Sequence, residues 1–324
     1  MVPTRIKAYQ FQIMPDIAEV TSSGLQSMAE LSQNMRGAVF MTLAMLAFTL
    51  NDTMIKLTNG EVGLYQAIFL RGVLATAVMG ILTWKTGGFK DLPKFAERPL
   101  LWRTVGELAG TIFFLTALFN MPLANAAAIL QAMPLVVTLG AAIVFREAVG
   151  WRRYTAIAAG LIGVIIIIRP GGDGFNIYSL SVIAAVFCLV LRDLATRSIN
   201  RAIPASFISF FSSAAVMVMG GIGTLFVEWQ PVSAIHLAQL SGSAIFLLSA
   251  YFFSIQAMRF GDVSFTSPFR YTALIWAGVL GFVFFADVPD MPMIIGSVIV
   301  VASGLFTLYR EHQLAIRSRL VVRP

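Results

Sequence analysis

Long apolar runs with almost no charge constrain this chain more than any other feature. Residues 38–50 and 154–168 contain no Asp, Glu, Lys or Arg, and similar segments recur from position 37 to position 309. A helix needs about 20 mainly apolar residues to cross the hydrocarbon core of a bilayer. Only 12% of the 324 residues are charged, against about a quarter in soluble domains. We therefore predict an all-α membrane protein, which excludes a soluble enzyme, a disordered protein and a nucleic-acid-binding module.

Ten transmembrane helices with short connections are predicted. Their ranges are 37–56, 63–84, 101–119, 123–145, 151–168, 177–197, 205–227, 238–258, 263–285 and 291–309. Residues 1–35 have no long apolar core, so they are predicted to be a loose cytoplasmic tail rather than a signal peptide, with Met28 or Met35 as alternative starts. Residues 310–324 form a second cytoplasmic tail.

Lys and Arg gather on one side of the predicted membrane. They lie in the N-terminal tail, in alternate connections and in the C-terminal tail: Arg5, Lys7, Arg36, Lys85, Lys90, Lys94, Arg98, Arg103, Arg146, Arg152, Arg153, Arg197, Arg201, Arg259, Arg310, Arg317, Arg319 and Arg323. The opposite side has only Lys56 and Arg169. Because cytoplasmic loops carry the excess of Lys and Arg, both termini of this multi-pass protein are predicted to be cytoplasmic. The net charge of +7 then reflects topology and not nucleic-acid binding.

A repeated acid–base motif suggests that the chain has two related halves. Asp52 is followed four residues later by Lys56, and Asp193 is followed four residues later by Arg197, at an offset of 141 positions. This spacing puts each acid and base on one helix face, so we predict a local pair of Asp52 and Lys56 near the outer surface. The matching motif then lies near the inner surface, and the two motifs suit opposed gates or structural pairs at helix ends.

A second match supports the same division. Phe-Arg-Glu at 145–147 corresponds to Phe-Ala-Asp at 285–287, at an offset of 140 positions. We interpret the chain as two five-helix repeats, 36–168 and 177–309. Because five is odd, the second repeat enters the membrane from the opposite side, as in many secondary transporters. Chance similarity among apolar helices is the alternative interpretation.

These motifs resemble a known family. The sequence Asn-Asp-Thr-Met-Ile-Lys at 51–56, Phe-Leu-Arg-Gly at 69–72, Pro134 and the segment 145–147 before a Gly-rich helix are similar to EamA-type transporters of the drug/metabolite superfamily. The resemblance covers residues 36–310. It implies ten helices in two repeats and the transport of a small molecule.

A finer resemblance concerns the ninth predicted helix. Ser-Pro-Phe-Arg-Tyr at 267–271, together with Asn51, Asp52 and Arg71, resembles the branch that includes bacterial riboflavin importers and S-adenosylmethionine uptake carriers. This resemblance implies riboflavin uptake across the bacterial inner membrane as the first expectation. S-adenosylmethionine uptake and the export of amino acids, drugs or other metabolites remain open.

Ionisable side chains at membrane depth are costly, which makes them functional candidates. Arg71 lies near the middle of the second predicted helix, where it would bind anionic or polar substrate groups or form a permanent ion pair. The other such side chains are candidates for gating or proton coupling, with simple ion pairing as the alternative: Asp52, Lys56, Glu107, Arg192 and Asp193.

Two prolines mark candidate breaks in helices. Pro268 can kink the ninth helix beside Arg270, and Pro134 can kink the fourth helix near Gln131. Tyr271 is expected to hydrogen-bond a substrate and Trp276 to stack on a planar ring, with packing as the alternative for Trp276. The predicted substrate-binding residues are Arg71, Gln131, Arg270, Tyr271 and Trp276.

Small residues predict close helix packing. Gly106 and Gly110 in the third helix, and Ala156, Gly160 and Gly163 in the fifth, have the spacing that lets helix backbones approach in lipid. The fifth and tenth helices have no internal charge, so we expect them to form an outer scaffold and a candidate homodimer face.

Motifs of other functional classes are missing from the sequence. Positions 80–86 lack the glycine that a phosphate-binding loop has before its lysine, so no ATP-driven pump is predicted. The single Cys188 and the distant His236 and His312 offer no metal site, cofactor site or catalytic residue. No channel filter is recognisable. The expected partners are a small-molecule substrate and the lipid bilayer, with an integral membrane enzyme or scaffold as the alternative class.

The two cargo candidates make different demands on a cavity. S-adenosylmethionine carries a cationic sulfonium and should therefore prefer Asp52, Glu107 or Asp193. Riboflavin should depend more on aromatic side chains and neutral hydrogen-bond donors.

Overall fold

The structure, a computed structural model, describes residues 14–90, 97–146, 150–172, 175–200, 202–261 and 263–321. Across these ranges the protein is helical and has no strand. The elements are α1 (Met14–Lys56), α2 (Leu64–Lys85), α3 (Arg98–Asn120), α4 (Leu123–Leu130), α5 (Met133–Val144), α6 (Trp151–Ile168), α7 (Tyr178–Arg197), α8 (Ala205–Thr224), α9 (Ala234–Phe260), α10 (Val263–Thr266), η2 (Ser267–Tyr271), α11 (Thr272–Phe285) and α12 (Met291–Val321).

Nine helical segments in the described part of the chain are long and apolar enough to cross a membrane. Two of them are composite, because α4 with α5 and the run from η2 to α11 each count as one segment. The remaining predicted helix, the third, corresponds to α3, which is less apolar because it contains Arg98, Arg103 and Glu107. All ten predicted helices are therefore present as helical segments.

The fourth and ninth segments are broken where the sequence predicts kinks. Helix α4 ends at Leu130 and α5 begins at Met133, with Pro134 in its first turn. In the ninth segment, Pro268 lies in the first turn of the 3-10 helix η2, between α10 and α11. Proline lacks an N–H group and its ring clashes with the carbonyl four residues earlier, so each helix restarts at the proline. The ranges 123–145 and 263–285 are thus not single helices.

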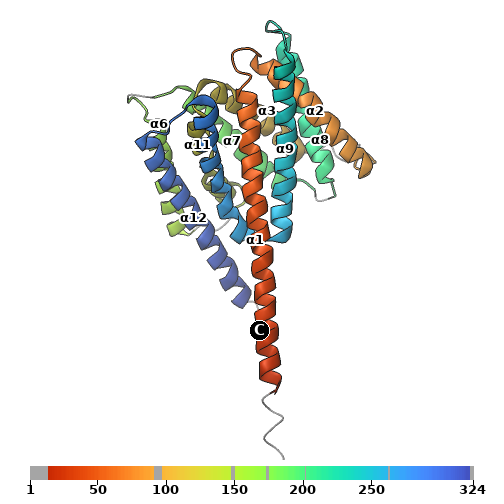
Figure 1. Cartoon of the computed structure of the whole chain (residues 1–324). Helices are drawn as coiled ribbons and strands as arrows, with labels where there is room; N and C mark the ends of the chain where they lie inside the picture. Colours follow the sequence, from red (N-terminus) through yellow and green to blue (C-terminus); the bar gives the residue numbers. More distant parts are fainter. Residues whose placement is uncertain are drawn as a thin grey trace, which may run out of the picture.

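Both ends of the chain are more helical than predicted. The expectation of a loose N-terminal tail is wrong for residues 14–35, which continue α1 as helix, whereas residues 1–13 lie outside the described ranges. Pro15 is tolerated in the first turn of α1, and no proline follows it before Lys56. Helix α12 likewise continues through most of the predicted second tail. The N-terminal end of α1 and the C-terminal end of α12 project from the same end of the bundle (Figure 1).

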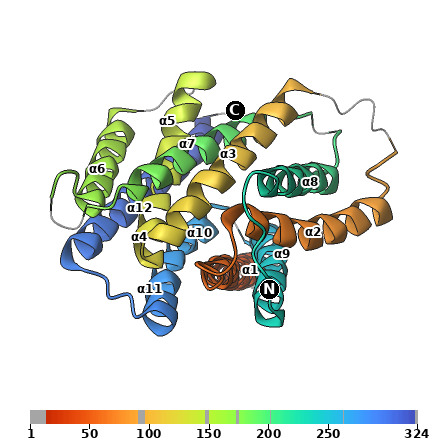
Figure 2. The same ribbon diagram turned by 90° about the horizontal axis from the view of Figure 1, so that it is seen from above.

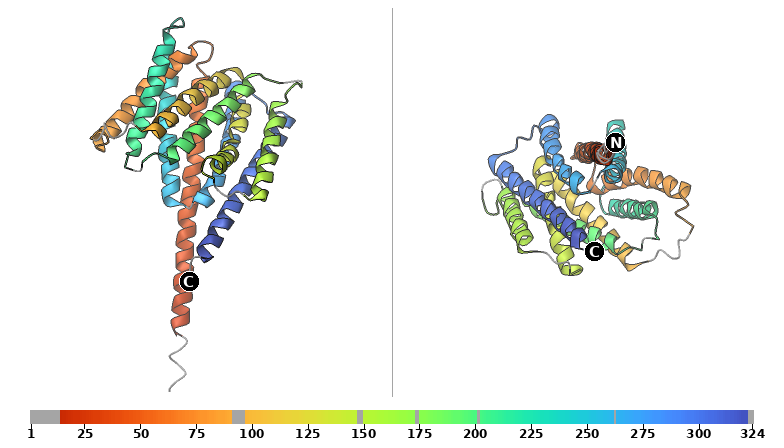
Figure 3. Two further views of the ribbon diagram at one scale, coloured as in Figure 1. Left: turned by 180° about the vertical axis from the view of Figure 1, so that it is seen from behind. Right: turned by 90° about the horizontal axis from the view of Figure 1, so that it is seen from below.

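The helices pack in pairs that are distant in sequence. Helix α1 packs along α9, α3 along α7, α2 along α8, and α6 along α12. Seen from above, α6 lies at one edge of the bundle and α2 at the opposite edge, with α3 and α7 between them (Figure 2). The view from behind shows α12 beside α6 (Figure 3). The expectation that the fifth and tenth helices are peripheral is consistent with this arrangement.

Glycines make the closest of these contacts. A Cβ atom on Gly106 would lie 2.5 Å from the backbone oxygen of Cys188 in α7. A Cβ atom on Gly163 would lie 2.8 Å from the backbone oxygen of Gly296 in α12. These positions confirm the predicted packing role of the small residues, because only glycine permits such an approach.

Candidate functional site

A cavity lies between α2, α3, α8 and α9. The space between these helices is about 650 Å³, including the part open to solvent. The side chains in its wall that carry charges or hydroxyl groups include Arg71, Arg103, Glu107, Ser212 and Tyr251. An apolar bundle with such a wall can enclose a polar substrate at membrane depth.

The cavity lies toward the end of the bundle from which the termini project. Helix α1 runs from that end to Lys56 at the other end, and Lys56 contacts the C-terminal end of α3 at Leu118. The residues of α3 that line the cavity are Arg103, Glu107 and Thr111, of which Arg103 and Glu107 lie in the half of α3 farther from Lys56. Because a helix rises about 1.5 Å per residue, Glu107 lies about 16 Å along the axis from Leu118.

Arg71 lines the cavity, as the sequence analysis predicts for a substrate-binding residue. Its Nη1 donates to Oδ1 of Asn51 at 3.4 Å, and the hydroxyl of Ser243 donates to the same oxygen at 2.7 Å. Asn51 Nδ2 in turn donates to Oδ1 of Asp52 at 2.9 Å. The charges of Arg71 and Asp52 also act on each other. Asp52 therefore supports one side of Arg71 through Asn51 and belongs to the edge of the site.

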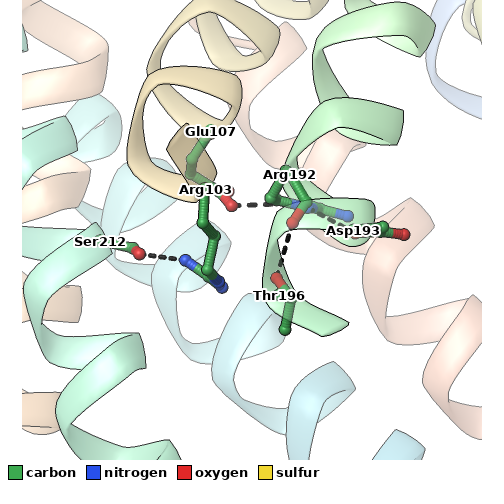
Figure 4. A network of polar contacts seen from close by, with 6 residues as sticks. All are labelled: Arg103, Glu107, Arg192, Asp193, Thr196 and Ser212. Carbon is green, nitrogen blue, oxygen red and sulfur yellow. Dashed lines mark hydrogen bonds and ion pairs between the residues drawn. The ribbon is translucent and has the colours of Figure 1, made fainter. Parts of the chain in front are cut away.

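A second network joins α3 to α7 and α8 (Figure 4). Arg192 Nη1 donates to Oε2 of Glu107 at 3.4 Å, and its Nε donates to Oδ1 of Asp193 at 2.8 Å. Arg103 Nη1 donates to the hydroxyl of Ser212. Three of the predicted gating residues thus lie together at the cavity, because Glu107 is in its wall and Arg192 pairs with both acids.

Arg103 is a residue whose place the sequence analysis assigned wrongly. The count of Lys and Arg on each side of the membrane put it in a cytoplasmic connection, but it is the sixth residue of α3 and lines the cavity. The available signal was its spacing of four residues from Glu107, which puts both side chains on one helix face.

Tyr251 was also missed. It lies in α9 and lines the cavity, whose wall also contains Arg71, Arg103 and Glu107. Its sequence context is an apolar stretch of α9, which gave no signal of a polar environment.

The two broken segments meet each other instead of lining this cavity. Gln131, at the end of α4, donates through Nε2 to the backbone oxygen of Arg270 at 3.5 Å. The structure therefore brings these two predicted binding residues together, but neither belongs to the cavity wall. Within the described part of the chain, Nε of Arg270 is buried and has no hydrogen-bond partner.

The predicted aromatic pair is also outside the cavity wall. The Tyr271 ring is buried, and its hydroxyl packs against Gly304 of α12, where a side chain would collide with it. Nε1 of Trp276 is buried and has no hydrogen-bond partner among the described residues. Helix packing is therefore the interpretation that fits both side chains in this structure.

Lys56 does not form the predicted local pair with Asp52. Its Nζ donates to the backbone oxygens of Leu118 and Met121, each at 2.6 Å, and lies 5.2 Å from the centre of the Phe285 ring. The last carbonyl groups of a helix have no N–H partner within the helix and carry a partial negative charge, so they attract a cation. The charge of Asp287 also acts on Lys56.

Asp287 joins the same end of the bundle to the fourth segment. Its Oδ2 accepts a hydrogen bond from the backbone N–H of Leu123 at 3.3 Å. Lys56, Asp287 and the ends of α3, α4 and α11 therefore form one connected group, which we call the outer latch. It lies at the end of the bundle opposite the projecting termini.

The described residues offer no site for a bound metal. Among them, no group of three or more His, Cys, Asp or Glu side chains is placed to hold a metal ion.

Comparison with known proteins finds one family model that matches part of the chain. Residues 35–169 match the EamA-like transporter family. The match covers the first predicted repeat, from the apolar part of α1 to the end of α6.

Three curated relatives match over most of the chain. One is the S-adenosylmethionine uptake transporter of Rickettsia prowazekii (strain Madrid E), 25% identical over 87% of this chain and 96% of the relative. Another is the riboflavin transporter of Vibrio cholerae serotype O1, 26% identical over 88% and 97%. The pseudopaline exporter of Pseudomonas aeruginosa (strain UCBPP-PA14) is 23% identical over 82% and 94%.

A solved crystal structure of another protein has the same fold. It matches with a TM-score of 0.59 at 18% identity, over 86% of this chain and 97% of that chain. The chain is thus similar, over most of its length, to proteins named as membrane transporters.

Proposed function

We propose that this EamA-like protein is a secondary transporter of the bacterial inner membrane that moves a small organic metabolite by alternating access. In this proposal two inverted five-helix repeats, 36–168 and 177–309, move against each other around the cavity. The observation that carries the proposal is the cavity itself, whose wall contains Arg71, Arg103 and Glu107 between helices of both repeats.

The bounds of the helices support two repeats. A shift of 141 positions moves α2 onto α8, the composite segment α4–α5 onto the run α10–α11, and α6 onto the apolar part of α12 (Met291–Arg310), each within a few residues. At a shift of 140 positions, Arg146 and Ala286 both adopt the left-handed backbone conformation, with φ of 54° and 53°. Few non-glycine residues do so, and these two end the equivalent helices α5 and α11.

The packing pattern supports a two-fold relation between the repeats. The same shift exchanges α1 with α7 and α3 with α9, so it converts the pair α1–α9 into the pair α7–α3, and both pairs are present. The pairs α2–α8 and α6–α12 convert into themselves. A two-fold axis between inverted halves accounts for every one of these pairs.

Ten membrane crossings and cytoplasmic termini complete the topology that we propose. The N-terminal end of α1 and the C-terminal end of α12 project from the same end of the bundle, which requires an even number of crossings between them (Figure 1). Helix α3 then crosses the membrane in addition to the nine apolar segments. The positive-inside bias puts the end with the termini in the cytoplasm.

This topology makes the structure a state closed to the outside. The outer latch joins α1, α3, α4 and α11 at the outer end, whereas the cavity lies toward the cytoplasmic end. Opening the latch and closing the cytoplasmic end would give the other state of an alternating-access cycle.

For the cargo we rank S-adenosylmethionine uptake before riboflavin uptake. The riboflavin expectation came from the branch resemblance, and its physical support was Tyr271 and Trp276. Neither lines the cavity, where Tyr251 is the single aromatic residue in the described wall. The carboxylate of Glu107 in the wall suits the sulfonium of S-adenosylmethionine. Both cargoes are named among the relatives, and the exporter among them keeps outward transport as an alternative.

The proposal is tested by transport into cells. Bacteria that lack flavin synthesis and their own riboflavin importer receive this gene or an empty vector, and the uptake of labelled S-adenosylmethionine and of labelled riboflavin is followed. We expect S-adenosylmethionine to accumulate only with the gene. If neither compound enters cells whose membranes contain the protein, and neither leaves cells preloaded with it, the proposed cargoes are wrong.

A further inference from the structure

Arg103 lines the cavity and, among the described residues, forms no ion pair with an acid, unlike Arg192 beside it. Arg192 pairs with Glu107 and Asp193. The Nη1 atom of Arg103 donates to the neutral hydroxyl of Ser212, and its Nε is buried with no hydrogen-bond partner within the described residues. No ion pair joins Arg103 to any acid in that part of the chain. An unpaired guanidinium in the wall of a cavity is a site for an anionic group.

Glu107 puts the opposite charge one helical turn away. Residues four apart in a helix lie on the same face, with about 6 Å between their Cβ atoms, and both Arg103 and Glu107 line the cavity. They do not pair with each other, because Glu107 pairs with Arg192. A carboxylate has about four lone-pair sites, so the single bond from Arg192 at 3.4 Å leaves Glu107 able to bind a cation.

We propose that Arg103 and Glu107 form a subsite for a zwitterion of the α-amino-acid type. The carboxylate of the substrate binds Arg103 beside the Ser212 hydroxyl, and its ammonium or sulfonium group binds Glu107 beside Tyr251. This inference rests on the proposed transport function and names the chemical class that the cavity selects. S-adenosylmethionine belongs to this class because it has a carboxylate, an ammonium and a sulfonium.

The same geometry discriminates against other ligands. Riboflavin has no charge for either side chain, so its binding would leave Arg103 unpaired. A zwitterionic lipid headgroup has the same pair of charges, so the experiment must separate it from a soluble substrate.

The test compares two ligands that differ by one carboxylate. The full chain is purified in detergent, and the binding of S-adenosylmethionine and of decarboxylated S-adenosylmethionine is measured for the wild type, Arg103→Gln and Arg103→Lys. We expect the wild type to bind the decarboxylated compound about 10- to 100-fold more weakly, as for the loss of a charged hydrogen bond. In Arg103→Gln the difference should fall below about 3-fold, and Arg103→Lys should restore part of it.

Arg98→Gln is the matched control, because Arg98 is an exposed arginine of the same helix outside the cavity wall. It should keep the full difference between the two ligands. A role of Arg103 in holding a lipid headgroup or the fold would leave the ratio between the two ligands unchanged in Arg103→Gln.

The outcomes separate this inference from the transport function. An unchanged ratio in Arg103→Gln, equal binding of both ligands by the wild type, or binding of riboflavin without S-adenosylmethionine overturns the inference. Binding with the expected ratio, but no transport by proteoliposomes that contain the protein, contradicts the transport function and leaves the subsite standing.

Discussion

Removal of the Lys56 ammonium should open the outer end of the transporter. Lys56 donates to two backbone oxygens of the α3–α4 connection at 2.6 Å each, and a hydrogen bond to a charged group contributes about 1.5–3 kcal/mol. Because Lys56 is partly exposed, we discount the summed range of about 3–6 kcal/mol for solvent screening to about 2–3 kcal/mol. Such a change corresponds to about a 30- to 150-fold shift toward the state open to the outside.

The assay measures how fast a cysteine behind the outer latch reacts from outside the cell. Ala124 is 2% exposed and lies at the start of α4, next to Leu123, so Ala124→Cys is a small substitution at the closed end. In a background that carries Cys188→Ala, a membrane-impermeant maleimide should label this cysteine about 30- to 150-fold faster when Lys56→Met is added.

The control is Lys85→Met, which removes an exposed lysine from the opposite end of the bundle. It should leave the labelling rate unchanged. Equal rates with and without Lys56→Met, in protein that keeps its thermal stability, would refute the assignment of Lys56 to the outer latch.

Three further predictions concern packing, acid stability and the aromatic residues. Gly106→Ala should lower the stability in detergent by about 1–3 kcal/mol, because its Cβ would lie 2.5 Å from a backbone oxygen of α7. Gly278→Ala is the control and should not lower it, because its Cβ meets nothing within 4 Å. Equal melting temperatures of the two variants would contradict this packing. Burial raises the pKa of Asp290, but the hydrogen bonds from Arg169 and from the Met293 N–H outweigh it and leave the pKa below its ordinary value of 3.8. The stabilisation of the folded protein by the Asp290 carboxylate is therefore complete above pH 3.8 and is lost as the pH falls through the lowered pKa. The difference in melting temperature between the wild type and Asp290→Asn should be constant from about pH 7 to 5 and shrink below about pH 4. A difference that does not depend on pH would contradict this prediction. Trp276→Phe and Tyr271→Phe should keep transport within about 3-fold of the wild type, since neither side chain lines the cavity. Arg71→Gln should reduce transport at least about 10-fold. The reverse ranking in an uptake assay would show that the substrate binds at Tyr271 and Trp276 instead.

The sequence predicts the helices well because their signal is local. Twenty-residue apolar runs specify each membrane segment, and Pro134 and Pro268 specify the two breaks through the missing N–H group of each ring. The glycines at 106 and 163 also carry a local signal, because small residues at this spacing have a known packing role in lipid. The helical structure of residues 14–35 was not predicted, because this segment has no apolar core and a segment without one was expected to be a loose tail.

The contacts of the site could not be predicted in the same way, because they depend on helices distant in sequence. Lys56 has an acid four residues earlier, but its partners are carbonyls of α3 about 60 positions later. Arg103 lies near a helix end, so its charge looks like a topological signal until the packing of α8 shows that it faces a cavity. Tyr271 has a hydroxyl suited to a substrate, but Gly304 leaves room for it inside the bundle.

The most direct test of the transport path is substrate protection inside the cavity. Ser213 lines the cavity on α8, so Ser213→Cys in a background with Cys188→Ala provides a reporter in its wall. In inside-out membrane vesicles, we predict that a maleimide labels this cysteine and that S-adenosylmethionine slows the labelling in proportion to its occupancy of the site. Labelling that is unaffected by a substrate which the same variant still transports would contradict the assignment of this cavity as the transport path.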